Sequence, residues 1–241
     1  MKYAFVAPVK YLQAARRAHV LGSYHLALVQ NLLWDAETAN VYRALHERGD
    51  FIMLDNGEAE GQQGNFEDVL RMAEHIGADE IILPDVIKDM QKTLDLHSKW
   101  CHAVPACKTA MIPQGKDVTE YLACLKDMVE WGFHFVTICV PKHLGVAGRV
   151  EVLTYLKDAM WDLEWNIHLL GLSANPYAEF KAYRDTGCRV RGIDSAAPVA
   201  WAQHDAVFQT GERYSIDWEG YASEKLVLQN LKVIQEEANL G

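Results

Sequence analysis

The chain has 241 residues, half of them hydrophobic, and a formal net charge of −10 at pH 7. This length is ample for a core without disulfides and is typical of α/β barrels, so we expect one domain over residues 1–241. The acidic charge argues against a nucleic-acid binder with a basic surface. No apolar run is long enough to span a membrane. The apolar stretch at the start is too short for a signal peptide, so we expect a cytoplasmic protein.

Eight short apolar runs recur along the chain at the spacing of a strand–loop–helix–loop unit. Continuous apolar runs of this length are typical of parallel strands that are covered on both faces. In chain order they are YAFVAP (3–8), HLALVQ (25–30), FIMLD (51–55), EIILPD (80–85), TAMIPQ (109–114), FVTICVP (135–141), NIHLLGL (166–172) and VRGID (190–194).

Amphipathic stretches with helical periodicity separate these runs. Capping residues predict where helices begin and end: Asn65 and Gly77 bound one, Gly132 closes another, and Asn175 and Gly187 bound a third. A last amphipathic helix is predicted within SEKLVLQNLKVIQ near the end of the chain. Eight β-α repeats predict a (β/α)8 TIM barrel. A doubly wound open sheet is the alternative, but the GxGxxG turn typical of many such folds is absent.

Cysteine and histidine spacings give no sign of a metal site. The five cysteines are odd in number and form no C-x-x-C pair, so they are predicted to be reduced thiols: Cys101, Cys107, Cys124, Cys139 and Cys188. The histidines show neither H-x-H nor H-E-x-x-H, so we expect no metal and no cofactor. His168 lies within a predicted strand and is interpreted as a packed interior histidine rather than a base.

Polar residues follow the predicted strands, at the end of a barrel where catalytic groups are found. Carboxylates there are costly to bury without partners, but each one alone could instead cap a turn or a helix. The strand ends carry Asp55, Asn56 and Gly57 (third), Asp85 (fourth), Gln114 and Gly115 (fifth), Lys142 and His143 (sixth), Gly171 and Ser173 (seventh), and Asp194 (eighth).

Two separated carboxylates that face one cleft suit substitution at an anomeric carbon. One can attack or stabilise the carbon, and the other can move a proton to or from the leaving group. A further aspartate and a glutamine have donors and acceptors that could read a heterocyclic base. Aldolase-like lyases and metal-dependent hydrolases use similar rims and remain alternatives. Trp201 and Trp218 follow the last strand and either pack or stack on a base.

The ordered motifs LDNG, LPD, PQGK, HLLGL and GIDSAAP, within residues 51–198, resemble the queuine/archaeosine tRNA-guanine transglycosylases. The resemblance implies that Asp194 is a nucleophile forming a glycosyl-enzyme intermediate and that Asp55 is the general acid/base. It also implies that Asp85 and Gln114 recognise the base, with Asn56, Gly115 and Gly171 beside them. The C-x-C-x-x-C…H zinc motif of that family is missing after Asp194, so a zinc subdomain is expected to be absent.

A compact, zinc-free chain is most similar to the phage and bacterial DNA 7-deazaguanine transglycosylases. The resemblance implies exchange of guanine in DNA for a base such as 7-cyano-7-deazaguanine, with tRNA as the alternative polymer. Cationic side chains in or just after the predicted loops either contact nucleic-acid phosphates or belong to solvated loops of mixed charge. They are Lys88, Lys116, Lys142, His143 and Arg149. A small-molecule glycosidase or lyase, and a catalytically silent binding barrel, are the rival interpretations.

Overall fold

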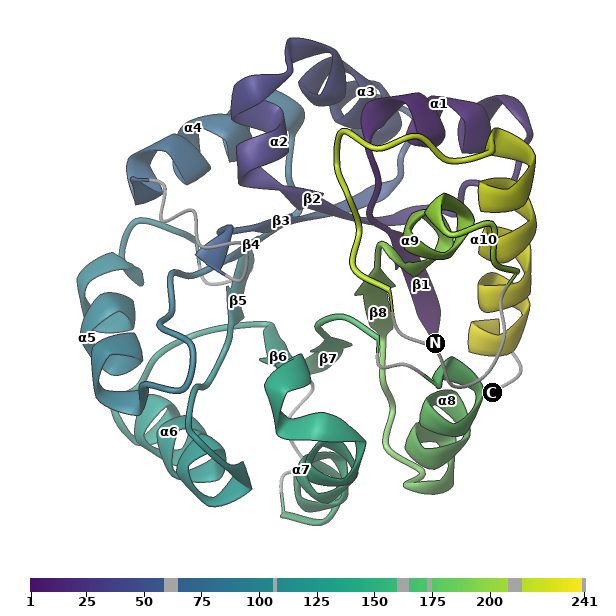
Figure 1. The fold of residues 1–241 in the computed structure, drawn as a ribbon. Coiled ribbons are helices and arrows are strands. Elements are labelled where there is room, and N and C mark those ends of the chain that lie inside the picture. Colours follow the sequence, from purple (N-terminus) through teal and green to yellow (C-terminus); the bar gives the residue numbers. More distant parts are fainter. Residues whose placement is uncertain (59–64, 106–107, 160–164, 173–174, 208–213, 240–241) are drawn as a thin grey trace.

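The structure, a computed structural model, describes residues 1–58, 65–105, 108–159, 165–172, 175–207 and 214–239. Eight parallel strands form one sheet in the order β1-β8-β7-β6-β5-β4-β3-β2, and β1 and β2, at the two ends of this order, pack side by side. Helices surround the strands (Figure 1), so the predicted TIM barrel is confirmed. Of the residues named above, Cys107 and Ser173 lie outside the described residues.

Each strand of the described chain is followed by one or more helices, as the periodicity predicts for β-α units. Their bounds are β1 (Lys2–Phe5), α1 (Val9–Arg17), β2 (Tyr24–Leu28), α2 (Val29–Trp34), α3 (Ala36–Glu47), β3 (Phe51–Asp55), α4 (Phe66–Ile76), β4 (Glu80–Ile82), α5 (Met90–Trp100), β5 (Thr109–Met111), α6 (Val118–Glu130), β6 (Thr137–Val140), η3 (Lys142–Leu144), α7 (Gly145–Ala159), β7 (Asn166–Leu169), α8 (Pro176–Asp185), β8 (Gly192–Ser195), α9 (Ala197–Gln203) and α10 (Glu224–Asn239).

Strand alternation divides the buried residues into two layers. One layer joins outward-facing strand residues to the helices, as with Ile193 and Leu54. The other consists mainly of strand residues, including Met53 and Cys139, and fills the barrel interior. Asp55 shares the face of Met53, and Asp194 lies opposite in parity to Ile193. Both carboxylates therefore point into the barrel at the carboxyl ends of their strands.

Several predicted boundaries differ from the structure. The third strand matches the run FIMLD, whereas β4 and β5 stop three residues before the ends of their apolar runs. Those extra residues form the first part of the βα-loops, where proline and polar side chains end the ladder. The predicted caps Asn65 and Asn175 are confirmed, because each side chain accepts a hydrogen bond from its helix. Among the described helices, none is long and apolar enough to cross a membrane.

An ion-paired plug closes the amino-terminal end of the barrel. Arg191 donates to both carboxylate oxygens of Glu80 at 2.6 Å, and the Thr137 hydroxyl donates to the same carboxylate at 2.7 Å. Glu80 and Thr137 are the first residues of β4 and β6, so this network lies at the opposite end of the barrel from Asp55 and Asp194. Polar groups at this end of a barrel serve stability.

Candidate active site in the barrel mouth

Asp194 is held by one carboxylate oxygen. Its Oδ1 accepts hydrogen bonds from His168 Nε2 and from the Gly171 backbone N–H, each at 3.1 Å. Among the described residues, Oδ2 has no such contact. The side chain is 14% exposed, while His168 is fully buried. Asp194 is therefore an oriented carboxylate with one reachable oxygen.

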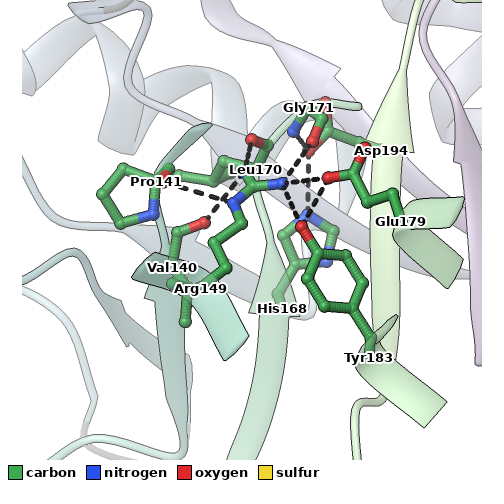
Figure 2. Close-up of polar contacts among 9 residues, drawn as sticks. All are labelled: Val140, Pro141, Arg149, His168, Leu170, Gly171, Glu179, Tyr183 and Asp194. Atoms are coloured by element: carbon green, nitrogen blue, oxygen red, sulfur yellow. Dashed lines mark hydrogen bonds and ion pairs between the residues drawn. The ribbon is translucent and has the colours of Figure 1, made fainter. Parts of the chain in front are cut away.

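Arg149 joins the ends of β6 and β7 beneath this carboxylate (Figure 2). Its guanidinium donates to the carbonyls of Pro141, Val140, Leu170 and Gly171. It also pairs with Glu179 at 3.0 Å and contacts the Tyr183 hydroxyl. One cation thus holds the turn that carries the Gly171 N–H, which is one of the two donors to Asp194.

The prediction that Arg149 contacts nucleic-acid phosphates is wrong. Its side chain is 1% exposed and lies in α7, not on a solvated loop. Arg149 falls on the same helical stripe as the buried residues Val152, Leu153 and Leu156, since positions three and four apart share a helix face. Burial and the ion pair with Glu179 remove its charge from the rim.

Asp55 is 8% exposed and takes part in the turn that follows β3. Its Oδ1 accepts from the Gly57 N–H at 2.7 Å, which is the capping contact that sequence alone allows. Because one oxygen serves the turn and the side chain faces the barrel interior, capping and a role in chemistry are compatible at this residue. The carboxylate is positioned by its own loop.

Asp85, Asn56 and Gln114 form one buried cluster across three βα-loops. Asp85 accepts from Asn56 Nδ2 at 2.8 Å on one oxygen and from Gln114 Nε2 at 2.6 Å on the other. Gln114 Oε1 in turn accepts from the Lys88 N–H. Burial raises the pKa of Asp85 to about 7, and these hydrogen bonds only partly oppose the rise. The predicted base-reading groups are thus brought together, but they contact one another.

A cleft of about 540 Å³ lies beside this cluster. Asn56 and Asp85 line it together with Phe66 from α4 and Leu96 and Trp100 from α5. The Phe66 and Trp100 rings pack at 5.1 Å between centroids. Asp85 therefore borders a cleft between two outer helices.

The remaining predicted contacts divide between structural and exposed positions. Gly115 is structural, because a Cβ there would lie 2.4 Å from the Tyr121 backbone nitrogen. Its carbonyl contacts His143 Nε2 at 2.8 Å, and burial lowers the pKa of His143. Lys88 and Lys116 are exposed on the rim as predicted, and Lys116 pairs with Glu120 on α6.

Lys142 packs at the end of β7, and Trp218 packs on the barrel interior. The Lys142 side chain packs against Gly171, whose ideal Cβ position is 3.9 Å from the lysine Nζ. Trp218 packs against the interior cluster, whereas Trp201 is buried under the helices. The Cys139 thiol lies inside the barrel, and burial raises its pKa well above the ordinary value, with Glu80, Asp55 and Asp194 adding to the rise. Cys139 is therefore a poor nucleophile.

His168 is packed inside the barrel as predicted, but its partners were missed. Its Nδ1 lies 2.8 Å from the Tyr24 hydroxyl, so Tyr24, His168 and Asp194 form a continuous chain. Strand alternation places His168 inside, because its neighbours Ile167 and Leu169 belong to the outer layer. The described residues contain no group of three side chains suited to a metal ion.

No protein-family model and no curated protein matches the chain. Solved structures match in fold. A D-psicose 3-epimerase from Clostridium cellulolyticum H10 has TM-score 0.58, 11% identity and coverage of 99% of this chain and 98% of that one. An N-acetylneuraminate lyase from Mycoplasma synoviae has TM-score 0.55, 9% identity and coverage of 98% and 96%. The chain spans about half (52%) of an N-succinyl Arg/Lys racemase from Bacillus cereus, which covers 82% of this chain with TM-score 0.53 and 12% identity. At these identities the likeness establishes the barrel fold alone.

Proposed function

We propose that the chain is a TIM-barrel enzyme that cleaves or transfers a glycosidic bond in the barrel mouth, with Asp194 as the nucleophile. The hydrogen-bond pattern of Asp194 carries this proposal: two donors hold Oδ1, while Oδ2 has no hydrogen bond or ion pair among the described residues. An oriented carboxylate with one unengaged oxygen suits attack at an anomeric carbon.

In the first step, Asp194 Oδ2 bonds to the anomeric carbon as the bond to the leaving group breaks. The leaving group departs with that electron pair and takes a proton from Asp55, which faces the same interior. In the second step, Asp55 removes a proton from the acceptor, whose lone pair displaces Asp194. With water as acceptor the reaction is hydrolysis, and with another base or alcohol it is transfer.

A small molecule is the substrate class that the comparisons favour. The epimerase and the lyase of similar fold are named for D-psicose and N-acetylneuraminate, which are small molecules. Burial of Arg149 removes one of five predicted phosphate contacts, and the chain carries a net charge of −10. Lys142 beside Gly171 also suits a lyase, in which an amine would act on a carbonyl substrate.

Guanine exchange in DNA is the second candidate, with tRNA as the alternative polymer. The order of the strand-end motifs supports it, and Lys88 and Lys116 are exposed on the rim, where phosphate contacts would form. In this version the target base leaves the stack to reach Asp194. Asp85 and Gln114 would also exchange part of their contact with each other for contacts with the incoming 7-deazaguanine.

One labelling experiment separates these substrate classes. The protein is incubated with labelled 7-deazaguanine and either DNA, tRNA or free guanosine, and each product is digested and tested for label. Label in DNA supports base exchange in that polymer, and label in tRNA supports the alternative. Label in free nucleoside, or glycoside cleavage without any base exchange, supports the small-molecule enzyme. Asp185→Asn, an exposed carboxylate on α8, is the matched control for Asp194→Asn. Equal turnover in these two variants would refute the role of Asp194.

A further inference from the structure

A chain of three side chains runs across the barrel interior below the proposed nucleophile. The Tyr24 hydroxyl, from the first residue of β2, lies 2.8 Å from His168 Nδ1 in β7. His168 Nε2 lies 3.1 Å from Asp194 Oδ1 in β8. Tyr24 and His168 are 2% and 0% exposed. Neither residue has a role in the proposed chemistry, so their burial as a polar pair calls for a reason.

Hydrogen-bond roles along this chain follow from Asp194. An ionised carboxylate only accepts, so His168 Nε2 must carry the hydrogen that it shares with Oδ1. In a neutral imidazole, Nδ1 then has a lone pair and can only accept. Tyr24 must therefore donate to Nδ1. Burial raises the pKa of Tyr24, and although the charge of Arg191 opposes the rise, the hydroxyl keeps its proton at neutral pH.

The surroundings of Tyr24 hold its ring in place for this contact. Phe51 stacks on the ring with centroids 5.2 Å apart and planes 9° apart, and the Arg191 guanidinium lies 5.5 Å from the centroid. Gly192 leaves room for the ring, since a Cβ there would approach it to 2.4 Å. Gly192, the glycine of the motif GID, thus leaves room for Tyr24, which contacts His168, which in turn contacts Asp194.

We propose that Tyr24 and His168 are positioning residues for Asp194: the Tyr24 hydroxyl holds the His168 ring through Nδ1, and the Nε2–H of that ring holds Asp194 Oδ1. The two donors, His168 and Gly171, then orient the carboxylate and leave Oδ2 to react. The effect of this positioning on catalysis rests on the proposed function, whereas the position of the hydrogen on His168 is a property of the protein without substrate.

Nitrogen-15 NMR of the histidine rings tests the assignment without any substrate. We expect hydrogen on Nε2 of His168 and a lone pair on Nδ1, as the contacts with Asp194 and Tyr24 require. In Tyr24→Phe we expect hydrogen to stay on Nε2, because Asp194 still accepts there, but the Nδ1 resonance to move, because Nδ1 loses its donor. Tyr42→Phe is the control, since it loses a buried hydroxyl contact to the Leu26 carbonyl away from His168. Hydrogen on Nδ1 of wild-type His168, or an unchanged spectrum in Tyr24→Phe, would overturn the proposal.

Kinetics supply the second readout once a substrate is found. A positioning role predicts that Tyr24→Phe lowers kcat about tenfold or more, with KM little changed, and shifts the pH profile. A purely structural role predicts a loss that Tyr42→Phe shares and no shift of the profile. If the tautomer is as expected but no glycosyl transfer is found, the proposed function fails and the positioning chain stands.

Discussion

Replacement of Arg149 by methionine tests how the site is held together. The substitution keeps much of the side-chain length but removes the charge that pairs with the buried Glu179, both being 1% exposed. Breaking a buried pair by removing one partner costs about 3–5 kcal/mol, since an uncompensated charge is left behind. The four strand-end carbonyls of β6 and β7 also lose their donor. We therefore expect the free energy of unfolding to fall by at least about 3 kcal/mol.

Urea unfolding followed by circular dichroism measures this loss, provided that the slope m, the dependence of the free energy of unfolding on urea concentration, is the same in variant and wild type. Arg71→Met is the matched control, because its pair with Asp68 is exposed and worth about 0–1 kcal/mol. Arg149→Met combined with Glu179→Leu should recover stability, as no buried charge is left unpaired. A loss in Arg149→Met no greater than that of Arg71→Met would refute the interpretation of Arg149 as a buried clamp.

Three further predictions concern buried groups. Asp85 has a folded-state pKa of about 7, above its ordinary value, so its contribution to stability is lost as pH rises from about 4 to about 7. Urea titrations across that window should show this fall in the free energy of unfolding for wild type but not for Asp85→Asn. A fall in Asp85→Asn equal to that of wild type would contradict the prediction. Gly192→Ala should lower the free energy of unfolding by about 1–3 kcal/mol because its Cβ meets the Tyr24 ring. Gly22→Ala, whose Cβ has ordinary contact distances, should stay within about 0.5 kcal/mol of wild type. Equal losses in the two variants would refute the argument that Gly192 makes room for Tyr24. His97 is buried, its ring nitrogens have no hydrogen-bond partner among the described residues, and burial lowers its pKa to about 3. His97→Leu should therefore raise the midpoint of thermal unfolding. A lowered midpoint would count against the conclusion that the His97 ring lacks hydrogen-bond partners.

Much of the fold follows from sequence periodicity. Apolar runs bounded by caps predict the barrel, and the strand FIMLD matches β3 because both its ends carry clear polar signals. The alternating parity within strands also places Asp55 and Asp194 on the interior face at the same end. These features are local, so a single sequence contains them.

Contacts between distant strands are not local, so the periodicity of the sequence does not predict them. The pairing of Tyr24 with His168 joins residues 144 positions apart, which no periodicity reveals. The sequence predicts Arg149 in a loop on the rim, yet α7 begins at Gly145 and buries it against Glu179. The cluster of Asp85 with Gln114 similarly depends on how three loops fold over one another.

Trapping the glycosyl-enzyme tests the central claim most directly. The protein is treated with a 2-deoxy-2-fluoro glycoside bearing a dinitrophenolate leaving group, and separately with guanine-containing DNA and nucleosides under acid quench. Peptide mass spectrometry then locates any adduct. We predict a covalent sugar on Asp194 that is absent from Asp194→Asn and kept in Asp185→Asn. An adduct on a different residue, or turnover that survives in Asp194→Asn, would contradict the account.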